Sequence, residues 1–524
     1  MKNFDFEKIP IVEIANEILL DGVKKGASDI HFDPSKDFLK IRMRIDGILY
    51  DYSTVPGEYK KNIVSRIKMI AGMNIMETRL PQDGAIKSKI GDKMLDLRVS
   101  SLPTNCGEKV VLRILDYSKS SQGLETLGFS ELNYKKILKM IAIPNGIVLV
   151  TGATGSGKST TVYSILQKLN TREVNIITVE DPVEMDVEGI NQVQAQQEIG
   201  LDFASVLRSI LRQDPDIIMI GEIRDSETAK IAVRASITGH KVLSTIHTNS
   251  ALNTIERLTD MEVERYLIGT SLNGVISQKL ARKLCPYCRI KRPTTDYEKS
   301  ILETVLHKKV DTVYDINKNG CEHCFKGYKN RIAIAEVLVI NDKIRTAITN
   351  GESKDVMRKL VYGEGNTHTL LEDGLEKILL GETSFDEVLK LADTENDLAI
   401  HIAKNKEKNI DTGIDEKEIL NAIPTPTVKT NETENKPKVI NQEQTNQNTK
   451  PVATNQAQIN QNAIKPPVAT NQAQANQNNI KPPVATNQAQ VNQNTIKPPV
   501  ATNQNKQNIE TLNFTNNNQI QPQN

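Results

Sequence analysis

The sequence predicts an α/β fold, and two observations carry that prediction. From about residue 145 onward, short runs of β-branched and aliphatic residues alternate with amphipathic helical segments, which is typical of a parallel sheet covered by helices on both faces. A glycine-rich loop separates the first of these strands from the helix that follows it. The predicted strands are Ile147–Val150, Ile176–Val179, Ile217–Ile220 and Val242–Ile246.

A small α+β domain is expected before this sheet, over residues 1–120. Residues 9–25 carry apolar side chains at helical spacing, and residues 39–50 alternate apolar and polar side chains around an Asp46-Gly47 turn. A second amphipathic helix is predicted over 58–74. Two strands joined by a proline-containing loop are predicted over 94–115.

Three further segments follow the parallel sheet, which is placed at 121–280. They are a cysteine-bearing segment at 281–335, a helical region at 336–410 and a tail at 411–524 rich in Asn, Gln, Pro and Thr. The tail repeats Pro-Val-Ala-Thr-Asn-Gln about every sixteen residues, from Pro451, Pro467, Pro483 and Pro499. Polar repeats this short cannot bury a core, so the tail is expected to be disordered, with a docking arm as the alternative.

Composition excludes several classes of protein. The formal net charge is +1, which argues against a general duplex-DNA binder. No run of eighteen apolar residues predicts a transmembrane helix, and Met1 to Ile18 lacks the basic and apolar regions of a secretory signal. We therefore expect a cytoplasmic protein.

The glycine-rich loop matches the Walker A pattern, two glycines followed by Lys and Ser at fixed spacing. Such a loop aims backbone N–H groups and the positive end of a helix at a phosphate chain. Lys158 is expected to reach the β- and γ-phosphates of ATP, and Ser159 to ligate Mg²⁺. The predicted nucleotide-binding residues are Gly152, Ala153, Thr154, Gly155, Ser156, Gly157, Lys158, Ser159 and Thr160.

Acidic residues follow two of the predicted strands. Glu222 comes directly after the strand Ile217–Ile220, at the edge where ligands of open α/β sheets bind, and is the candidate to activate water. Glu180 and Asp181 follow Ile176–Val179 and are candidates for Mg²⁺ or its waters, with Glu184 just beyond. The alternative for each is an ordinary solvated loop residue.

A histidine follows the strand Val242–Ile246. His247 is expected to sense the γ-phosphate or to contact a catalytic carboxylate, and His240 lies just before the same strand. A structural role is the alternative for a lone histidine. Two of seven histidines beside a strand whose end is expected to face phosphate favour a functional role.

Four of the five cysteines form two Cys-x-x-Cys pairs, at Cys285/Cys288 and Cys321/Cys324. Four thiolates suit a tetrahedral structural Zn²⁺ site, although the gap of 32 residues between the pairs is longer than in common zinc ribbons. A redox pair is the alternative. His323 is expected not to coordinate, and Cys106 is expected to be a small apolar filler.

Taken together, these motifs closely resemble the type II secretion and type IV pilus assembly ATPases. The matching boxes are the Walker A box Gly152–Thr160, the Asp box 177–184, the Walker B box Asp216–Asp225 and the His box 239–249. Ala27-Ser28-Asp29-Ile30-His31 and Arg79-Leu80-Pro81-Gln82-Asp83-Gly84 resemble signatures of the N-terminal domain of the family. The likeness extends over roughly residues 10–395.

The resemblance implies a PAS-like N-terminal domain, a RecA-like ATPase core and a hexamer that holds ATP between the two domains of each subunit. It implies that Arg79 and Arg98 approach the γ-phosphate, with surface ion pairs as the alternative. It also implies a tetracysteine zinc module at this place, which retraction-type relatives generally lack. Only about 25 residues precede Ala27, so the additional N-terminal docking domain of many members is expected to be missing.

The hypothesis is therefore a hexameric ATP hydrolase with ATP, Mg²⁺ and Zn²⁺ as cofactors. It would drive assembly of a type IV pilus through an inner-membrane platform protein, bound peripherally at the cytoplasmic face. A pseudopilus motor for type II secretion or DNA uptake is the alternative. An ATP-binding scaffold without turnover is disfavoured by Lys158 and Glu222, and a retraction motor by the four cysteines.

Overall fold

The computed structural model describes residues 1–90, 93–115, 123–363 and 367–407, except for the side chains of residues 88–95 and 407. The predicted tail at 411–524 lies outside the described residues, so its expected disorder stays a prediction. The described residues all belong to one compact unit, Met1–Thr425.

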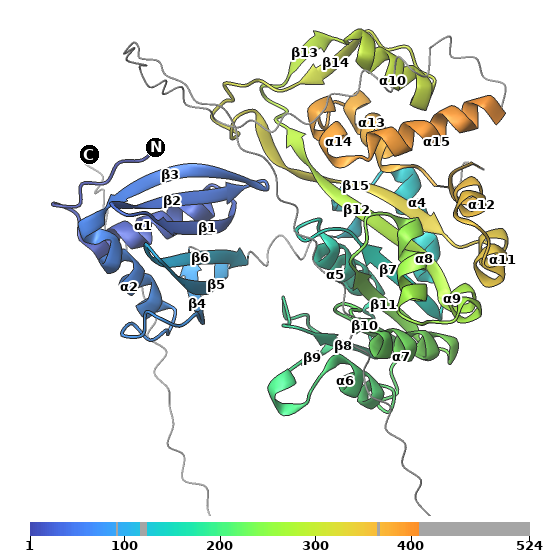
Figure 1. Cartoon of the computed structure of the whole chain (residues 1–524), viewed down its shortest axis with the longest axis horizontal. Helices are drawn as coiled ribbons and strands as arrows, with labels where there is room; N and C mark the ends of the chain where they lie inside the picture. The colour runs from blue at the N-terminus through green and yellow to red at the C-terminus, as the bar shows by residue number, and fades with distance from the viewer. Residues whose placement is uncertain (91–92, 116–122, 364–366, 408–524) are drawn as a thin grey trace, which may run out of the picture. The chain divides into compact units, whose positions relative to one another are not determined.

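The N-terminal region is an antiparallel sheet packed on two helices (Figure 1). Its six strands have the order β3-β2-β1-β6-β5-β4. The elements in chain order are α1 (Ile11–Lys24), β1 (Ala27–Pro34), β2 (Phe38–Ile45), β3 (Ile48–Pro56), α2 (Lys60–Ile70), β4 (Gln82–Ile90), β5 (Lys93–Thr104) and β6 (Gly107–Leu115). One core buries Ile14 and Ile18 of α1 with Phe32, Ile41 and Leu112 of the sheet.

The predicted α+β character of this region is confirmed, with one local error. The positive φ angles of Asp46 (49°) and Gly47 (87°) form the predicted turn between β2 and β3. Pro103 does not lie in a loop. It is the penultimate residue of β5, opposite Glu108, and the chain turns after Thr104. The likeness to PAS domains stays a prediction.

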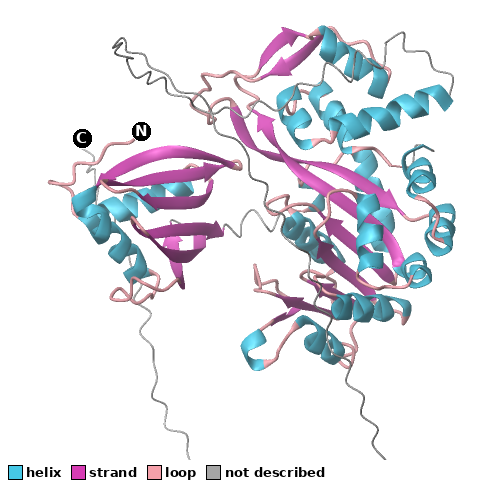
Figure 2. Ribbon diagram, viewed as in Figure 1, coloured by secondary structure: helices cyan, strands magenta, loops and turns pink. Residues whose placement is uncertain are grey.

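A mostly parallel sheet of seven strands forms the centre of the second region (Figure 2). The order is β15-β12-β7-β11-β10-β8-β9, and β15 alone runs antiparallel to its neighbour. The strands are β7 (Gly146–Thr151), β8 (Ile176–Glu180), β9 (Asn191–Gln194), β10 (Ile217–Ile220), β11 (Lys241–Ile246), β12 (Leu272–Leu284) and β15 (Tyr328–Val339). The four strands predicted from sequence are β7, β8, β10 and β11.

Helices cover both faces of this sheet, as the continuous apolar strands predict. Side chains of β7 alternate between the two layers, since Ile147 joins one core and Val148 the other. The helices of the first layer include α6 (Phe203–Ile210), α7 (Ser226–Ile237), α8 (Ala251–Asp260) and α9 (Arg265–Ser271), and those of the second include α4 (Glu131–Ala142) and α5 (Lys158–Leu169). The fold class predicted for this region is thus confirmed at the level of a helix-covered parallel sheet.

The cysteine-bearing segment is inserted between the long strands β12 and β15. It contains β13 (Ile290–Pro293), α10 (Asp296–Leu306) and β14 (Thr312–Asp315). The expected boundaries at 280 and 335 therefore each fall within a strand. Beyond β15 the described chain is helical, with α11 (Asp342–Asn350), α12 (Lys354–Arg358), a π-helical turn (Lys359–Gly363), α13 (Leu370–Leu379), α14 (Phe385–Leu391) and α15 (Thr394–Glu407).

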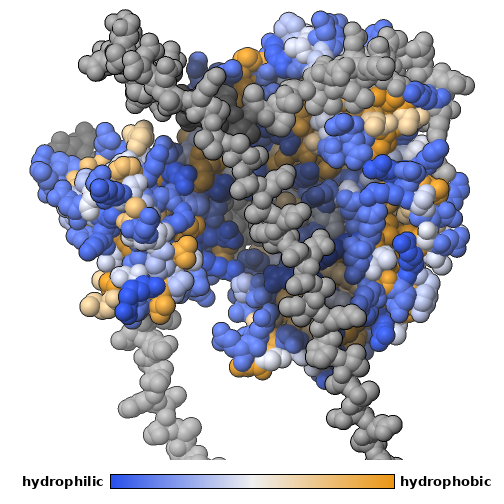
Figure 3. Space-filling view, in the orientation of Figure 1, coloured by the Kyte–Doolittle hydropathy of each residue, from blue (hydrophilic) through white to orange (hydrophobic). Residues whose placement is uncertain are grey.

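The face of the molecule shown in Figure 3 carries mostly hydrophilic side chains with scattered apolar ones. Within the described ranges, no helix combines the length and the apolar character that spanning a bilayer would need.

Candidate active site

The loop between β7 and α5 has the backbone that its glycines allow. Gly152, Gly155 and Gly157 have φ angles of 146°, 79° and 91°, where residues with a Cβ are strained. A Cβ on Gly152 would also lie 2.4 Å from the carbonyl oxygen of Gln278 on β12. Gln278 braces the loop, because its Nε2 donates to Ser156 O at 2.8 Å and its Oε1 accepts from Thr161 Oγ1 at 2.8 Å.

Lys158 is the first residue of α5 and its side chain lies against the loop. Its Nζ donates to the carbonyl oxygens of Gly152 at 2.9 Å and Ala153 at 3.3 Å. Burial lowers the pKa of Lys158, since the charged form loses water. An ammonium group at the start of a helix, beside backbone N–H groups, is suited to bind an anion such as phosphate.

A cavity of about 490 Å³ opens over this loop. The strand order places β11 between β7 and β10, with β8 beyond them, so the carboxyl ends of four parallel strands meet at one edge. Residues from all four predicted boxes line the cavity: Thr154, Gly155, Gly157, Lys158, Ser159, Thr160, Glu180, Asp181, Glu184, Glu222, Arg224, Thr245 and His247. The sheet thus brings together residues of the four boxes that are up to 93 positions apart (154 to 247).

Glu222 lies at the centre of a small charged cluster. Its carboxylate forms an ion pair with the guanidinium of Arg224, and its Oε2 is 3.3 Å from Nε2 of His247. The expected contact between His247 and a carboxylate at this edge is therefore present. Burial, with the charges of Lys158 and Arg224, lowers the pKa of His247 below its ordinary value of 6.5. A neutral imidazole is thus available to donate a hydrogen bond to Glu222.

Glu180 is held differently from Glu222. It is buried at the end of β8, and its carboxylate accepts hydrogen bonds from Tyr163 Oη, Thr178 Oγ1 (2.6 Å) and Gln192 Nε2 (3.1 Å). Burial, with the nearby carboxylate, raises the pKa of Tyr163, so its hydroxyl remains a donor. Three protein donors leave Glu180 less free for a metal ion than its exposed neighbour Asp181.

The oxygen ligands near the loop suit Mg²⁺, which prefers carboxylates, hydroxyls and water. Ser159 is exposed at the start of α5, and Asp181 is exposed beyond β8. Glu184 lines the same cavity. The chemistry of these donors therefore fits the expected cation, with Ser159 and Asp181 as the more accessible of the three predicted ligands and Glu180 behind them.

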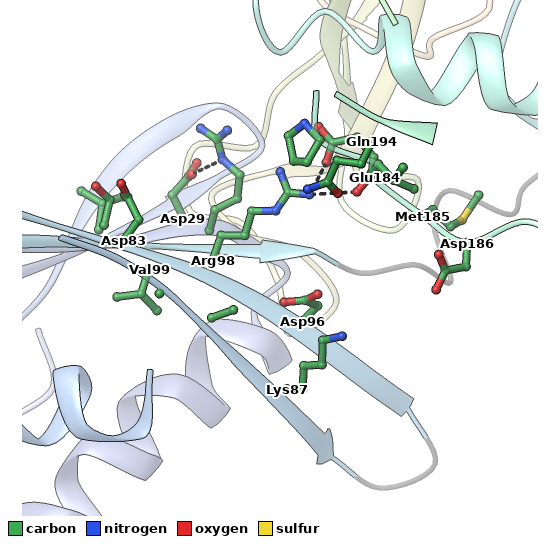
Figure 4. A pocket seen from close by; sticks show the side chains of 17 residues that line it. Asp29, Asp83, Lys87, Asp96, Arg98, Val99, Glu184, Met185, Asp186 and Gln194 are labelled. Carbon is green, nitrogen blue, oxygen red and sulfur yellow. Dashed lines mark hydrogen bonds and ion pairs between the residues drawn. The ribbon is translucent and has the colours of Figure 1, made fainter. Parts of the chain in front are cut away.

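The two predicted arginines of the N-terminal region do not line this cavity. Arg79 is 86% exposed and is bound through Nη2 to Glu77 Oε2 at 2.9 Å. Arg98 reaches the segment after β8, where its Nη2 donates to Val183 O at 3.2 Å and lies 3.4 Å from Glu184 Oε2 (Figure 4). Arg98 lines a second cavity, of about 880 Å³, which also includes Glu184.

Two sequence interpretations need correction. His240 lies before β11, at the edge opposite the phosphate loop, and its Nδ1 is 2.9 Å from Ala235 O, which is a structural role. Cys106 is no core filler. It is half-buried in the turn between β5 and β6, and its carbonyl oxygen accepts a hydrogen bond from Lys60.

The four paired cysteines come together at the base of the inserted segment. The Sγ atoms of Cys285 and Cys321 are 3.7 Å apart, as are those of Cys288 and Cys324. All four sulfurs lie within 4.8 Å of one another. A tetrahedron of Zn–S bonds of 2.3 Å has sulfurs about 3.8 Å apart, so the geometry fits a structural Zn²⁺. His323 lies outside this group, with its Nε2 3.3 Å from Glu322 Oε1.

Comparison with known proteins decides the family. A model of the family "Type II/IV secretion system protein" matches residues 5–390. The chain belongs to this family. It is 46% identical over 387 residues to the type II secretion system protein E of Dickeya dadantii, covering 74% of this chain and 76% of that protein. It is also 46% identical over 382 residues to the type IV pilus assembly ATPase PilB of Myxococcus xanthus, covering 72% and 67%.

A solved structure supports the fold of this type II/IV secretion family member. The ATPase DotB of Legionella pneumophila aligns with a TM-score of 0.55 at 23% identity, covering 74% of this chain and 97% of that one. Family membership, together with the relatives described as ATPases, identifies the chain as an ATP hydrolase.

Sequence reasoning missed several residues of this ATPase site. Arg224 was included in the Walker B box without a role of its own, yet its guanidinium contacts Glu222 and lies 3.9 Å from Asp181 Oδ2. Arg331 of β15 lines the cavity, and its Nη1 is 3.4 Å from Gly155 O. Tyr163 donates a hydrogen bond to Glu180, and Gln278 holds the phosphate loop through Ser156 O. Arg331 and Gln278 reach the site only through the sheet order, and no local pattern could have shown them.

Proposed function

We propose that ATP is hydrolysed in the cavity over residues 152–160, with Glu222 as the group that accepts the proton of the attacking water. The observation that carries the proposal is the convergence of four strand ends and their acids on the phosphate loop. Lys158 binds the β- and γ-phosphates, and His247 orients Glu222. Ser159 and Asp181 would hold Mg²⁺, backed by Glu180, and the cation would supply charge neutralisation at the phosphate oxygens.

Hydrolysis is completed, in this proposal, by residues of another subunit. Arg79 is exposed and bound to Glu77 rather than to any residue of the nucleotide cavity, so a neighbouring subunit is where it can meet a phosphate. Arg98 lies closer, beside Glu184, and is the candidate to act within or next to the same cavity. Charge compensation by arginine at the transferred phosphoryl group is the physical reason. A hexameric ring is the assembly that supplies such contacts to every site.

The output of this ring is assembly of a filament of pilin-like subunits. We propose a cytoplasmic motor of a type IV pilus, which acts peripherally on an inner-membrane platform protein. The four-cysteine group supports an assembly motor over a retraction motor. Equal identity to a type II secretion system protein E favours one alternative, a pseudopilus motor for secretion.

Glu222→Gln tests the catalytic part. The variant is expected to bind ATP and to hydrolyse it at least about a hundredfold more slowly, because the amide is not a base. Glu262→Gln is the matched control, since Glu262 pairs with Lys230 on the surface, away from the cavity. Unimpaired hydrolysis by Glu222→Gln would assign the water to another residue.

The same variant tests the output when it replaces the chromosomal gene. Loss of surface pili, with exported proteins still reaching the medium, supports the pilus motor. Loss of protein export with pili intact supports the secretion alternative. If pili and protein export both persist although the purified variant no longer hydrolyses ATP, both proposed outputs are wrong. Cross-linking that yields no species larger than a dimer in the presence of Mg²⁺ and ATP would contradict the ring.

A further inference from the structure

Glu222, the proposed base, forms an ion pair with Arg224. Both residues lie on the short segment that joins β10 to α7. Ile223 between them is buried, its N–H donates to Thr245 O at 2.9 Å, and Gly221 N donates to Val179 O at 2.8 Å. The backbone of the segment is therefore fixed to the strands on both sides. Any change in the ion pair has to come from the side chains.

The two side chains differ in freedom. Glu222 is 13% exposed and Arg224 is 59% exposed. The carboxylate is also held on its other oxygen by His247, at 3.3 Å. The guanidinium has a second acid within reach, since its Nη1 lies 3.9 Å from Asp181 Oδ2. Arg224 is thus the movable partner, and it lies between the acid expected to bind Mg²⁺ and the acid expected to activate water.

A carboxylate whose charge is neutralised by a guanidinium is a poor acceptor for the proton of water. Mg²⁺ at Asp181 would repel the guanidinium, whereas the γ-phosphate of ATP would attract it. Arginine binds phosphate oxygens through several parallel hydrogen bonds, so it loses little by changing partners. His247 needs no movement and keeps Glu222 oriented.

We propose that Arg224 is a positioning residue that holds Glu222 and exchanges this carboxylate for the γ-phosphate of bound ATP. When ATP is bound, Glu222 is free to accept a proton. Without ATP, its carboxylate stays paired with Arg224. The inference rests on the proposed role of Glu222 and adds a control of that role. It predicts that the affinity for ATP is lower than it would be without the ion pair, because ATP binding must break this contact.

The test is a double-mutant cycle on nucleotide affinity, with ATPγS and ADP as probes, the full-length protein and Mg²⁺ present. Glu222→Gln removes the competing charge, so the affinity for ATPγS is expected to rise by about twofold to fivefold, the range for a partly exposed ion pair. ADP lacks the γ-phosphate, so its affinity is expected to stay the same. In an Arg224→Gln background, Glu222→Gln is expected to leave both affinities unchanged.

Two results would overturn the inference. One is an equal gain in ATPγS affinity from Glu222→Gln with and without Arg224. The other is no gain at all in the protein that retains Arg224. Lys230→Gln, on α7, is the control for loss of a nearby cation, because Lys230 pairs with Glu262 at 2.8 Å and does not line the cavity. If Arg224→Gln does not fold, Arg224→Lys serves, with a reduced but nonzero gain expected.

The rate of ATP hydrolysis distinguishes a failure of this inference from a failure of the proposed function. If Glu222→Gln hydrolyses ATP at the wild-type rate, Glu222 is not the base and the proposed function fails, whatever the affinities show. If hydrolysis is lost and the cycle shows no coupling, Glu222 keeps its role and the exchange by Arg224 is wrong.

Discussion

The nucleotide cavity and the four-cysteine group are built in opposite ways. The cysteines come from two local turns, in which Cys288 N donates to Cys285 O and Cys324 N donates to Cys321 O. The cavity collects single residues from the ends of four strands, so its geometry depends on the order of the whole sheet. One site holds four equivalent thiols within 4.8 Å of one another, as a closed structural metal site requires. The other holds opposite charges that can change partners.

This contrast predicts how each site fails. Losing a ligand from the cysteine group should remove the metal and the stability that depends on it. Losing a charge from the cavity should remove a chemical step and leave the fold. The two sites also share a structural element, because the strands β12 and β15 that frame the cysteine segment contribute Leu280 and Arg331 to the cavity.

The largest effect is expected from Cys321→Ser. Structural zinc contributes roughly 10–16 kcal/mol to small zinc-binding domains, so loss of one thiolate should release the metal and loosen residues 285–327. Zinc content by atomic emission and proteolysis of the segment measure this. Cys106→Ser, in the turn after β5, is the control and should change neither. Absence of zinc from the purified wild-type protein would show that the cysteines have another role.

The next effect is expected from Lys158→Ala. Removal of one group that stabilises charge in a transition state typically costs about a hundredfold to a thousandfold in rate, so hydrolysis should nearly vanish while zinc content stays unchanged. Lys168→Ala, on the exposed last turn of α5, is the matched control. Hydrolysis by Lys158→Ala at the wild-type rate would place the phosphates elsewhere.

The contrast between a local site and one that depends on the whole sheet also explains which features could be predicted from the sequence. The Walker A loop and the Cys-x-x-Cys pairs are local, and the structure places each set of residues together. The strands β7, β8, β10 and β11 were predicted because short, continuous runs of β-branched and aliphatic residues are distinctive. The roles of Glu180 and Asp181 were not separable, because the hydrogen bonds from Tyr163 and Gln192 follow from packing.

The sequence interpretation was wrong for residues near the ends of strands, whose place in the sheet the local sequence does not determine. His240 and His247 flank the same strand and therefore lie at opposite edges of the sheet, and the parallel pairing of β11 with β7 places His247 at the edge of the phosphate loop. Pro103 suggested a loop, yet β4 pairs with β5 only up to Ser101, so beyond that point the edge tolerates a proline. The paired strands β12 and β15 were missed, since the inserted segment separates them by 43 residues (285 to 327).

A smaller effect is expected from His247→Gln. Because the pKa of His247 is lowered, the imidazole is neutral at neutral pH and becomes charged only as the pH falls below about 6.5. A cationic imidazole beside Glu222 would then oppose proton transfer to this carboxylate, so wild-type hydrolysis should fall on acidification. His247→Gln should lose roughly tenfold in kcat at neutral pH and show a weaker fall in acid.

The measurement is kcat from about pH 5 to about pH 8 for both proteins, with zinc content followed in parallel. Thiolates are protonated in acid and release their metal, so this control separates the two sites. An acid loss of activity that is identical in both proteins would assign the titration to a group other than His247.

The smallest effect is expected from His323→Gln. Histidine is a common zinc ligand, and His323 lies between Cys321 and Cys324 in sequence. Its ring instead packs against Tyr287, with centroids 4.4 Å apart and the ring planes inclined by 44°, and its Nε2 lies 3.3 Å from Glu322 Oε1. The substitution should therefore leave zinc content unchanged and alter the free energy of unfolding by no more than about 0.5 kcal/mol, as for most surface changes. Loss of zinc from this variant would make the histidine a ligand, and the four thiols would no longer form a closed site by themselves.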